Sequence, residues 1–208
     1  MREISIKNIC HKLVNEYGVK LDDKIALDFF ARGGDWQTKF YADKVKKVYA
    51  WEIDSKHEKS LKQNLPEDSV VTIGNSFSLA KEKNNFFDIV VLDNPQGCFG
   101  KNNVYCEHFE ALKMSFNLLK KNGGILIFNV KTKPFDYTDK LEWQNRRNDF
   151  YSLSDASYLS EEFVFDFYKD LFTIHGYTSR FIFLEKRPQE PGLYALTTEI
   201  FRTPDELN

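Results

Sequence analysis

The stretch Ile25-Ala26-Leu27-Asp28-Phe29-Phe30-Ala31-Arg32-Gly33-Gly34-Asp35-Trp36 decides the fold of this 208-residue chain. It starts as a short apolar run, carries one acidic residue, and then breaks into a glycine pair followed by polar residues. This order predicts a buried strand over 25–30, a tight turn and the start of a helix. Glycine suits such a turn because the backbone takes unusual angles there, or because a ligand approaches the main chain closely. In an α/β sheet, nucleotide-like ligands bind at the carboxyl end of such a strand.

Strands and helices alternate on both sides of this stretch. An amphipathic helix is predicted over 4–17, with Gly18 as its stop. Further strands are predicted at 45–52, 70–73, 86–92 and 125–130, and helices at 36–43, 55–64 and 105–119. The run at 86–92 is almost entirely apolar, as expected for a strand that is buried on both faces of a parallel sheet. Strands alternating with helices in this way predict stacked βαβ units.

The pattern changes after residue 130. Residues 131–157 are polar and aromatic without clear periodicity, and we interpret them as an insertion or lid in which 143–151 could form a short helix. A plain solvated helix and a surface for single-stranded nucleic acid are the alternatives for this helix. A helix over 160–175 and two strands at 180–186 and 193–201, pairing as a hairpin, complete the chain. The predicted fold is α/β: one domain over 1–208, a Rossmann-like three-layer sandwich with a mainly parallel seven-stranded sheet and a C-terminal antiparallel hairpin.

The net charge and the cysteine content of the chain make some classes of function less favoured than others. The net charge of −2 gives no global basic footprint, which weighs against a strong DNA binder. Three sparse cysteines, Cys10, Cys98 and Cys106, fit a reducing cytoplasm better than a disulfide framework. Their spacing with His108 matches no standard zinc pattern, so we predict no metal site. Without a long apolar run or a signal peptide, we expect a soluble cytoplasmic protein with no membrane partner.

The element order resembles that of the class I S-adenosylmethionine-dependent methyltransferases. Within them, residues 27–34 look like the LD-x-FAGSG loop of amino-methyltransferases that act on adenine or cytosine in nucleic acids. Phe30, Ala31 and Gly34 match that loop, while Arg32 replaces its first glycine. The resemblance implies S-adenosylmethionine as cofactor, with its methionine part against the main chain of this loop. A plain strand–turn–helix junction is the structural alternative.

The resemblance also assigns residues at the ends of the next strands. Glu52 stands where the family holds an acid against the ribose hydroxyls, and Asp54 is its possible substitute. Asn75 stands where many relatives have an aspartate that contacts the adenine amino group, although asparagine is equally a routine turn residue. The implied cofactor-binding set is Asp28, Phe30, Ala31, Gly33, Gly34, Glu52, Asn75 and Ser76.

The stretch Asp93-Asn94-Pro95-Gln96 resembles the D-P-P-Y or N-P-P-Y motif of the same enzymes. In that motif the acid or amide and a main-chain carbonyl accept hydrogen bonds from the target amine, and the aromatic residue stacks on a base flipped out of its helix. Asp93 and Pro95 fit, whereas Asn94 replaces a proline and Gln96 replaces the aromatic residue. The implied catalytic residues are Asp93, Asn94 and Pro95.

The missing aromatic residue affects the expected acceptor. Its loss removes about 1–3 kcal/mol of base stacking, unless Phe99 or Tyr105 supplies a ring. The first hypothesis is therefore a methyltransferase that modifies an amine of a DNA or RNA base. The alternatives are a small-molecule methyltransferase and a methyltransferase-like binding or scaffold protein that no longer catalyses.

Overall fold

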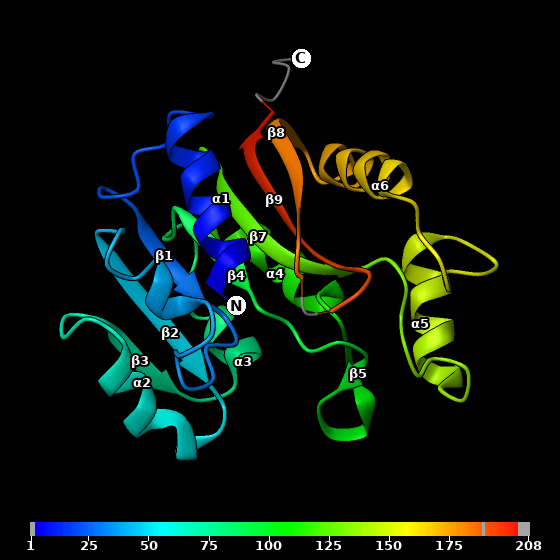
Figure 1. The fold of residues 1–208 in the computed structure, drawn as a ribbon, viewed down its shortest axis with the longest axis horizontal. Helices are drawn as coiled ribbons and strands as arrows, with labels where there is room; N and C mark the ends of the chain where they lie inside the picture. The colour runs from blue at the N-terminus through cyan, green and yellow to red at the C-terminus, as the bar shows by residue number, and fades with distance from the viewer. Residues whose placement is uncertain (1–2, 189, 204–208) are drawn as a thin grey trace.

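The computed structural model describes residues 3–188 and 190–203 and contains the predicted seven-stranded sheet. In spatial order the strands are β3 (Val70–Ile73), β2 (Lys47–Glu52), β1 (Ile25–Asp28), β4 (Ile89–Leu92), β7 (Gly124–Lys131), β9 (Leu193–Arg202) and β8 (Tyr177–Lys186). The first five run parallel, and β9 is antiparallel to both of its neighbours (Figure 1). The mainly parallel sheet with a C-terminal antiparallel hairpin is thus confirmed.

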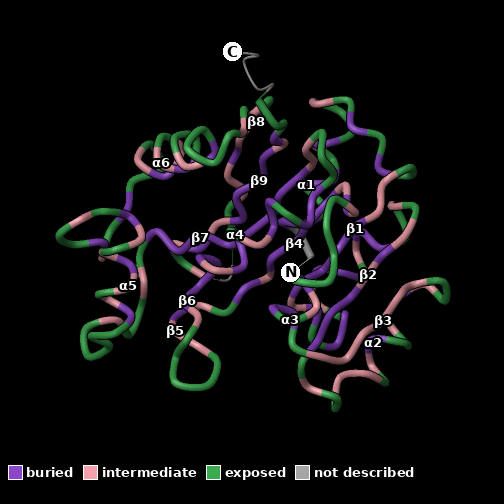
Figure 2. The backbone as a smooth tube through the Cα atoms, turned by 180° about the vertical axis from the view of Figure 1, so that it is seen from behind, coloured by how far each residue is buried: buried purple, intermediate pink, exposed green. Residues whose placement is uncertain are grey.

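Helices cover both faces of the sheet and complete the three layers (Figure 1). One face packs against α1 (Glu3–Asn15) and α2 (Glu58–Asn64). The other packs against α3 (Ser76–Ala80), α4 (Phe109–Leu118) and α6 (Glu161–Ile174). The central strands are buried along their length, as Figure 2 shows, because side chains from both of their faces enter one of these two cores.

The strand order creates a crevice at one edge of the sheet. The chain passes from β1 to β2 and β3 on one side and then returns to place β4 on the other side of β1. Loops that leave the carboxyl ends of β1 and β4 therefore turn in opposite directions, and ligands of open α/β sheets bind at such a switch point.

Several predicted elements are shorter than expected: the strand over 25–30 ends at Asp28, and the helix over 105–119 begins only at Phe109. The predicted helix over 36–43 is wrong, since the structure has only a single 3₁₀ turn, Thr38–Phe40. The side chains of Thr38 and Tyr41 both turn inward to donate hydrogen bonds to Asp28, which holds this segment in successive turns. The strand expected over 86–92 begins only at Ile89.

Three short elements were not predicted, and one of them replaces the first residues of the helix expected over 105–119. These are α3 and the two-residue strands β5 (Cys98–Phe99) and β6 (Tyr105–Cys106), which form an antiparallel hairpin directly after the Asp93–Gln96 segment. Strands this short are too brief to display the alternation from which strands are recognised.

The insertion at 131–157 is anchored to the core through α5 (Leu141–Tyr151). Arg147 is fully buried and forms an ion pair with the equally buried Glu107. Its other guanidinium nitrogens donate to the main-chain oxygens of Lys131, at 2.8 Å, and Ala156, at 3.1 Å. One buried side chain therefore ties both ends of the insertion to the end of β6. Among the described residues, no helix is long and apolar enough to cross a membrane.

We expect Arg147→Met to lower the free energy of unfolding by about 3–5 kcal/mol, because it leaves the Glu107 carboxylate buried without a cation. The double variant Arg147→Met/Glu107→Gln should recover much of that loss. Urea unfolding measures both. The matched control is Arg146→Met, which removes the neighbouring, partly exposed pair with Glu110 and should cost less than about 1 kcal/mol. Equal losses for Arg146→Met and Arg147→Met would contradict the anchoring role.

Candidate functional site

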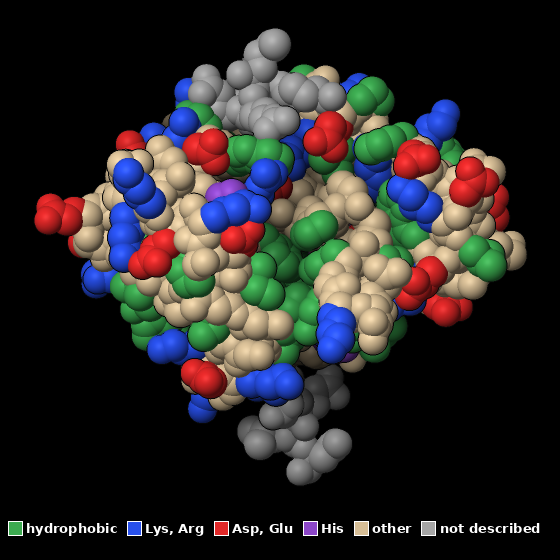
Figure 3. All heavy atoms as spheres, turned by 90° about the horizontal axis from the view of Figure 1, so that it is seen from below, with side chains coloured by type: hydrophobic (Ala, Val, Ile, Leu, Met, Phe, Trp, Pro, Cys, Tyr) green, Lys and Arg blue, Asp and Glu red, His purple; other side chains and the backbone are tan. Residues whose placement is uncertain are grey.

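A cavity of about 750 Å³ lies at the carboxyl ends of β1 to β4. Figure 3 views this end of the molecule, where hydrophobic side chains gather around the hollow and charged side chains stand at its rim. The walls come from the loops after these strands, the β5–β6 hairpin and the connection between β8 and β9. The aromatic residues that line it are Phe30, Trp36, Trp51, Phe77, Phe99 and Tyr105.

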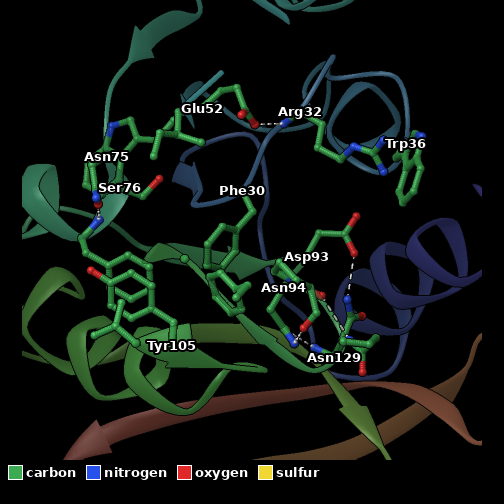
Figure 4. A pocket seen from close by; sticks show the side chains of 18 of the residues that line it. Phe30, Arg32, Trp36, Glu52, Asn75, Ser76, Asp93, Asn94, Tyr105 and Asn129 are labelled. Atoms are coloured by element: carbon green, nitrogen blue, oxygen red, sulfur yellow. Dashed lines mark hydrogen bonds between the residues drawn. The ribbon is translucent and has the colours of Figure 1, made fainter. Parts of the chain in front are cut away.

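Glu52 fastens the loop after β1 to the end of β2. Its Oε2 accepts a hydrogen bond of 2.7 Å from the main-chain N–H of Arg32 (Figure 4), and its Oε1 accepts one of 2.8 Å from that of Asp54. The side chain lines the cavity although the residue is only 7% exposed. A carboxylate oxygen can accept two hydrogen bonds, so each oxygen keeps capacity for a donor on a ligand.

The glycine pair shapes the loop by packing against α2. Gly34 has a φ of +71°, and a Cβ there would lie 3.2 Å from Leu61 and 3.3 Å from Leu65. The turn and the close approach of α2 therefore both require glycine at this position. Like Ala31, neither Gly33 nor Gly34 lines the cavity. Of the expected loop contacts, the structure brings Phe30 to the cavity wall and leaves these three residues behind it.

Asp28 lies beneath the same loop, with 1% of its surface exposed, and does not line the cavity. Its Oδ2 accepts hydrogen bonds from Thr38 Oγ1, at 2.6 Å, and Tyr41 OH, at 3.3 Å. Its Oδ1 accepts one from the Phe30 N–H at 3.3 Å. Burial raises the pKa of Asp28 to about 7, against the opposing effect of the Thr38 hydroxyl. Asp28 therefore supports the loop from behind.

The end of β3 provides a second group of polar atoms. Asn75 is the N-cap of α3, where its Oδ1 accepts a hydrogen bond of 2.9 Å from the Phe77 N–H. Ser76 is buried beside it, with its hydroxyl donating to the Phe29 carbonyl oxygen at 2.7 Å. Both residues line the cavity. Asn75 is therefore a turn residue and a cavity-lining residue at the same time.

Ile53 is a lining residue that the sequence analysis missed. It directly follows Glu52 and is 67% exposed, which is unusual for an isoleucine in a well-packed domain. The available signal was its position: an apolar residue immediately after the acid at a strand end.

Asp93 stands on the opposite side of the cavity in a polar cluster. Its Oδ1 accepts hydrogen bonds from Asn129 Nδ2, at 2.8 Å, and from Arg187, at 2.9 Å (Figure 4). The same Arg187 nitrogen donates to Asn129 Oδ1 at 2.9 Å. The carboxylate is thereby fixed in orientation and paired with a cation. Asn129 was recognisable as a polar residue within the apolar strand 125–130, whereas Arg187 carried no signal.

The segment 94–96 differs from the resembled motif in its contacts as well as in its residues. Gln96 donates a hydrogen bond of 3.1 Å to the main-chain oxygen of Asn94, the carbonyl expected to face an amine. The Asn94 side chain accepts from the Asn129 N–H at 3.0 Å, and Pro95 is exposed at the cavity wall. The segment is therefore held by its own side chains.

The two rings considered as substitutes for the missing aromatic residue do reach the cavity. Phe99 and Tyr105 line it from the β5–β6 hairpin. Tyr105 stacks on Phe77 with ring centroids 3.5 Å apart, and Phe99 meets Phe30 edge-on at 5.9 Å. No described residue of 131–157 is among the lining residues, so the lid role of the insertion stays a prediction.

Solved structures of other proteins are similar to this chain in fold. No protein-family model matches the chain, and a comparison with curated proteins finds no match. TYW2 from M. jannaschii, solved with AdoMet, matches over 97% of this chain and 77% of its own, with 15% identity and a TM-score of 0.58. A putative RNA methyltransferase, PH1948 from Pyrococcus horikoshii, matches over 95% of this chain and 84% of its own, with 16% identity and a TM-score of 0.55.

A third match is a small-molecule enzyme. The 1,6-didemethyltoxoflavin-N1-methyltransferase of Burkholderia thailandensis, solved with its substrate and S-adenosylhomocysteine, matches over 97% of this chain and 79% of its own, with 14% identity and a TM-score of 0.56. The chain spans only 64% and 62% of the length of two other matched proteins. The chain therefore has the fold of S-adenosylmethionine-dependent methyltransferases, and fold alone does not fix the reaction.

We expect Asp28→Asn to gain stability relative to the unchanged protein as pH rises. Because burial raises the pKa of Asp28 to about 7, its stabilising contribution is complete only below its ordinary value near 4 and is lost as pH rises through 7. The Asp28→Asn variant has no such titration and so does not lose stability in this way. The hydroxyl groups of Thr38 and Tyr41 can rotate to accept hydrogen bonds from the new amide. The advantage of the variant should grow by on the order of 2–3 kcal/mol between pH 5 and pH 8 in urea unfolding.

The control for this pH dependence is Asp54→Asn. The pKa of the partly exposed Asp54 is lowered by its hydrogen bond from Lys56, so that carboxylate does not titrate in this window. A difference between Asp28→Asn and the unchanged protein that is the same at both pH values would refute the buried-acid account.

Proposed function

We propose that the chain is an S-adenosylmethionine-dependent methyltransferase. The observation that carries the proposal is the Glu52 carboxylate, which stands at the end of β2 with acceptor capacity toward the cavity. Two neighbouring hydroxyl groups of a ribose are the donors that suit a carboxylate in this position. The exposed Ile53 beside it offers apolar cover for a flat nucleobase, and Asn75 Oδ1 has capacity for a second donor.

The remainder of the cavity suits the charged part of this cofactor. The cofactor supplies a methyl group on a positively charged sulfonium. Aromatic faces and a carboxylate are favourable surroundings for such a cation, and Phe30 and Asp93 both line the cavity. The volume of about 750 Å³ lies within the usual range for cofactor and ligand sites.

We assign the acceptor side to Asp93. Arg187 and Asn129 hold its carboxylate in one orientation, so it can accept a hydrogen bond from an amine and direct the nitrogen lone pair toward the methyl group. The cofactor would supply the methyl group and keep the electrons of the carbon–sulfur bond on its sulfur, while the amine held by Asp93 would release its proton to water. Gln96 shares the Asn94 carbonyl, which leaves more of the orientation to Asp93 than in the resembled motif.

The rings of the β5–β6 hairpin favour an aromatic amine as acceptor. Phe99 and Tyr105 present faces or edges on which a base could pack, which supports a nucleic-acid base as the first candidate. A small aromatic molecule is the second candidate, because the net charge of −2 offers no broad basic surface for a polyanion. Transfer assays that offer RNA, DNA and nucleosides in parallel separate the two.

Isothermal titration tests the cofactor directly. S-adenosylmethionine should bind with a dissociation constant below about 100 μM, which corresponds to roughly 5.5 kcal/mol. Glu52→Gln should weaken binding at least about 10-fold, because one acceptor for a ribose hydroxyl becomes a donor. Undetectable binding at millimolar cofactor would falsify the proposed function.

The matched control for that titration is Glu58→Gln. Glu58 is an acid in the first turn of α2 that pairs with Lys62 and does not line the cavity. The Glu58→Gln variant should bind the cofactor with the same affinity as the unchanged protein. Unfolding temperatures recorded in parallel separate a loosened loop from a lost ligand contact.

Asp93→Asn tests the acceptor side. We expect transfer to the acceptor found in the parallel assays to fall by at least about 10²-fold, because the amide orients the amine less well. Cofactor affinity should change much less. If the unchanged protein binds cofactor and transfers no methyl group to any acceptor class, the scaffold alternative gains and the catalytic role of Asp93 is lost.

A further inference from the structure

Arg32 is an exposed cation at the cavity wall, where the resembled loop has glycine. Its backbone is left-handed, with a φ of +49°, which side chains rarely adopt and which glycine adopts without cost. Its guanidinium lies 3.8 Å from the centre of the Trp36 ring. No carboxylate of the described residues forms an ion pair with it. An arginine that is held by stacking, with no anionic partner in the described part of the chain, is suited to receive one from a ligand.

The path of the side chain starts at Glu52. The Arg32 N–H is bonded to the Glu52 carboxylate, and the side chain then extends along the cavity wall to Trp36 (Figure 4). A ligand whose sugar is held by Glu52 would begin at the same point. The chain that links the ribose of S-adenosylmethionine to its carboxylate has nearly as many bonds as an arginine side chain. A tail running beside Arg32 would therefore end near its guanidinium.

We propose that Arg32, oriented by Trp36, binds the carboxylate of the cofactor's amino-acid tail; this rests on the proposed function. Stacking on Trp36 occupies one face of the guanidinium and leaves its in-plane N–H groups available. A carboxylate pairs with two of these donors in a bidentate arrangement. The substitution of glycine thus keeps the left-handed turn and adds a charge that selects the tail.

The backbone strain supports a role in binding over an accident of sequence. A left-handed residue with a side chain costs roughly 1 kcal/mol more than glycine, and such cost is retained mainly where a site uses it. The competing account is that Arg32 blocks the methionine site and prevents cofactor binding. The two accounts predict opposite responses to removal of the guanidinium.

Titration of three ligands into two variants tests the proposal. The ligands are S-adenosylmethionine, decarboxylated S-adenosylmethionine and 5′-methylthioadenosine, which lacks the whole amino-acid tail. The first variant is Arg32→Gln, and the control is Lys39→Gln, which removes an exposed cation nearby that does not line the cavity. We expect Arg32→Gln to bind S-adenosylmethionine about 10- to 100-fold more weakly. Its affinity for the other two ligands should stay within about 2-fold, and Lys39→Gln should change none of the three.

Several results would overturn the proposal while leaving the proposed function standing. One is an equal loss for all three ligands in Arg32→Gln, which would give Arg32 a role in loop shape only. Another is unchanged or tighter binding of S-adenosylmethionine, which would identify Arg32 as a barrier. If the unchanged protein binds none of the three ligands, the proposed function itself fails.

Arg32→Gly separates binding from stability. Relief of the left-handed strain should raise the unfolding temperature, while loss of the guanidinium should weaken S-adenosylmethionine to the same extent as Arg32→Gln. Opposite movement of the two quantities supports a ligand-binding guanidinium. Tighter cofactor binding in the glycine variant would overturn the proposal.

Discussion

The hydrogen bond from the main-chain N–H of Arg32 to Glu52 is the constraint on which the cavity depends. It fastens the loop after β1 to the end of β2, two neighbouring parallel strands whose carboxyl ends meet at one edge of the sheet. Once the loop is fixed there, Phe30 and Arg32 face the cavity and Gly34 turns toward α2. A single carboxylate thus sets the loop path and also stands at the cavity wall with capacity for a ligand.

Two aspartates at strand ends have different roles because their surroundings differ. Asp28, at the end of β1, is buried among hydroxyl donors, and burial raises its pKa to about 7. Asp93, after the adjacent β4, reaches the cavity and is paired with Arg187. Asp28 therefore holds the loop in place, whereas Asp93 presents an oriented acceptor. The resemblance placed both at a ligand, and only the contacts around each one distinguish them.

Periodicity and strand-end residues were sufficient to predict the sheet, because both are local features of the chain. The contacts that complete the site are not local. Asn129 and Arg187 lie 36 and 94 residues from Asp93 in sequence, and no pattern near Asp93 indicates either one. The predicted helix over 36–43 failed for the same reason, since its hydroxyl side chains bind an aspartate on a neighbouring strand. Strand-end patterns therefore predicted candidate residues such as Glu52, Asn75 and Asp93, which line the cavity. The residues that hold them in place depend on side-chain pairing across the fold, which local sequence does not reveal.

Two of the departures from the resembled motifs, Arg32 and Gln96, make specific contacts of their own, and this bears on whether the site still acts. A site that has lost its function accumulates substitutions that need not contact anything in particular. Here Arg32 stacks on Trp36, and Gln96 donates to the Asn94 carbonyl. The aromatic surface that Gln96 no longer supplies is present in Phe99, on the adjoining hairpin. One departure lies where the tail of a cofactor would end and the other where an acceptor would enter. Under the proposed function, that distribution fits a site adapted to its own ligands better than a site in decay.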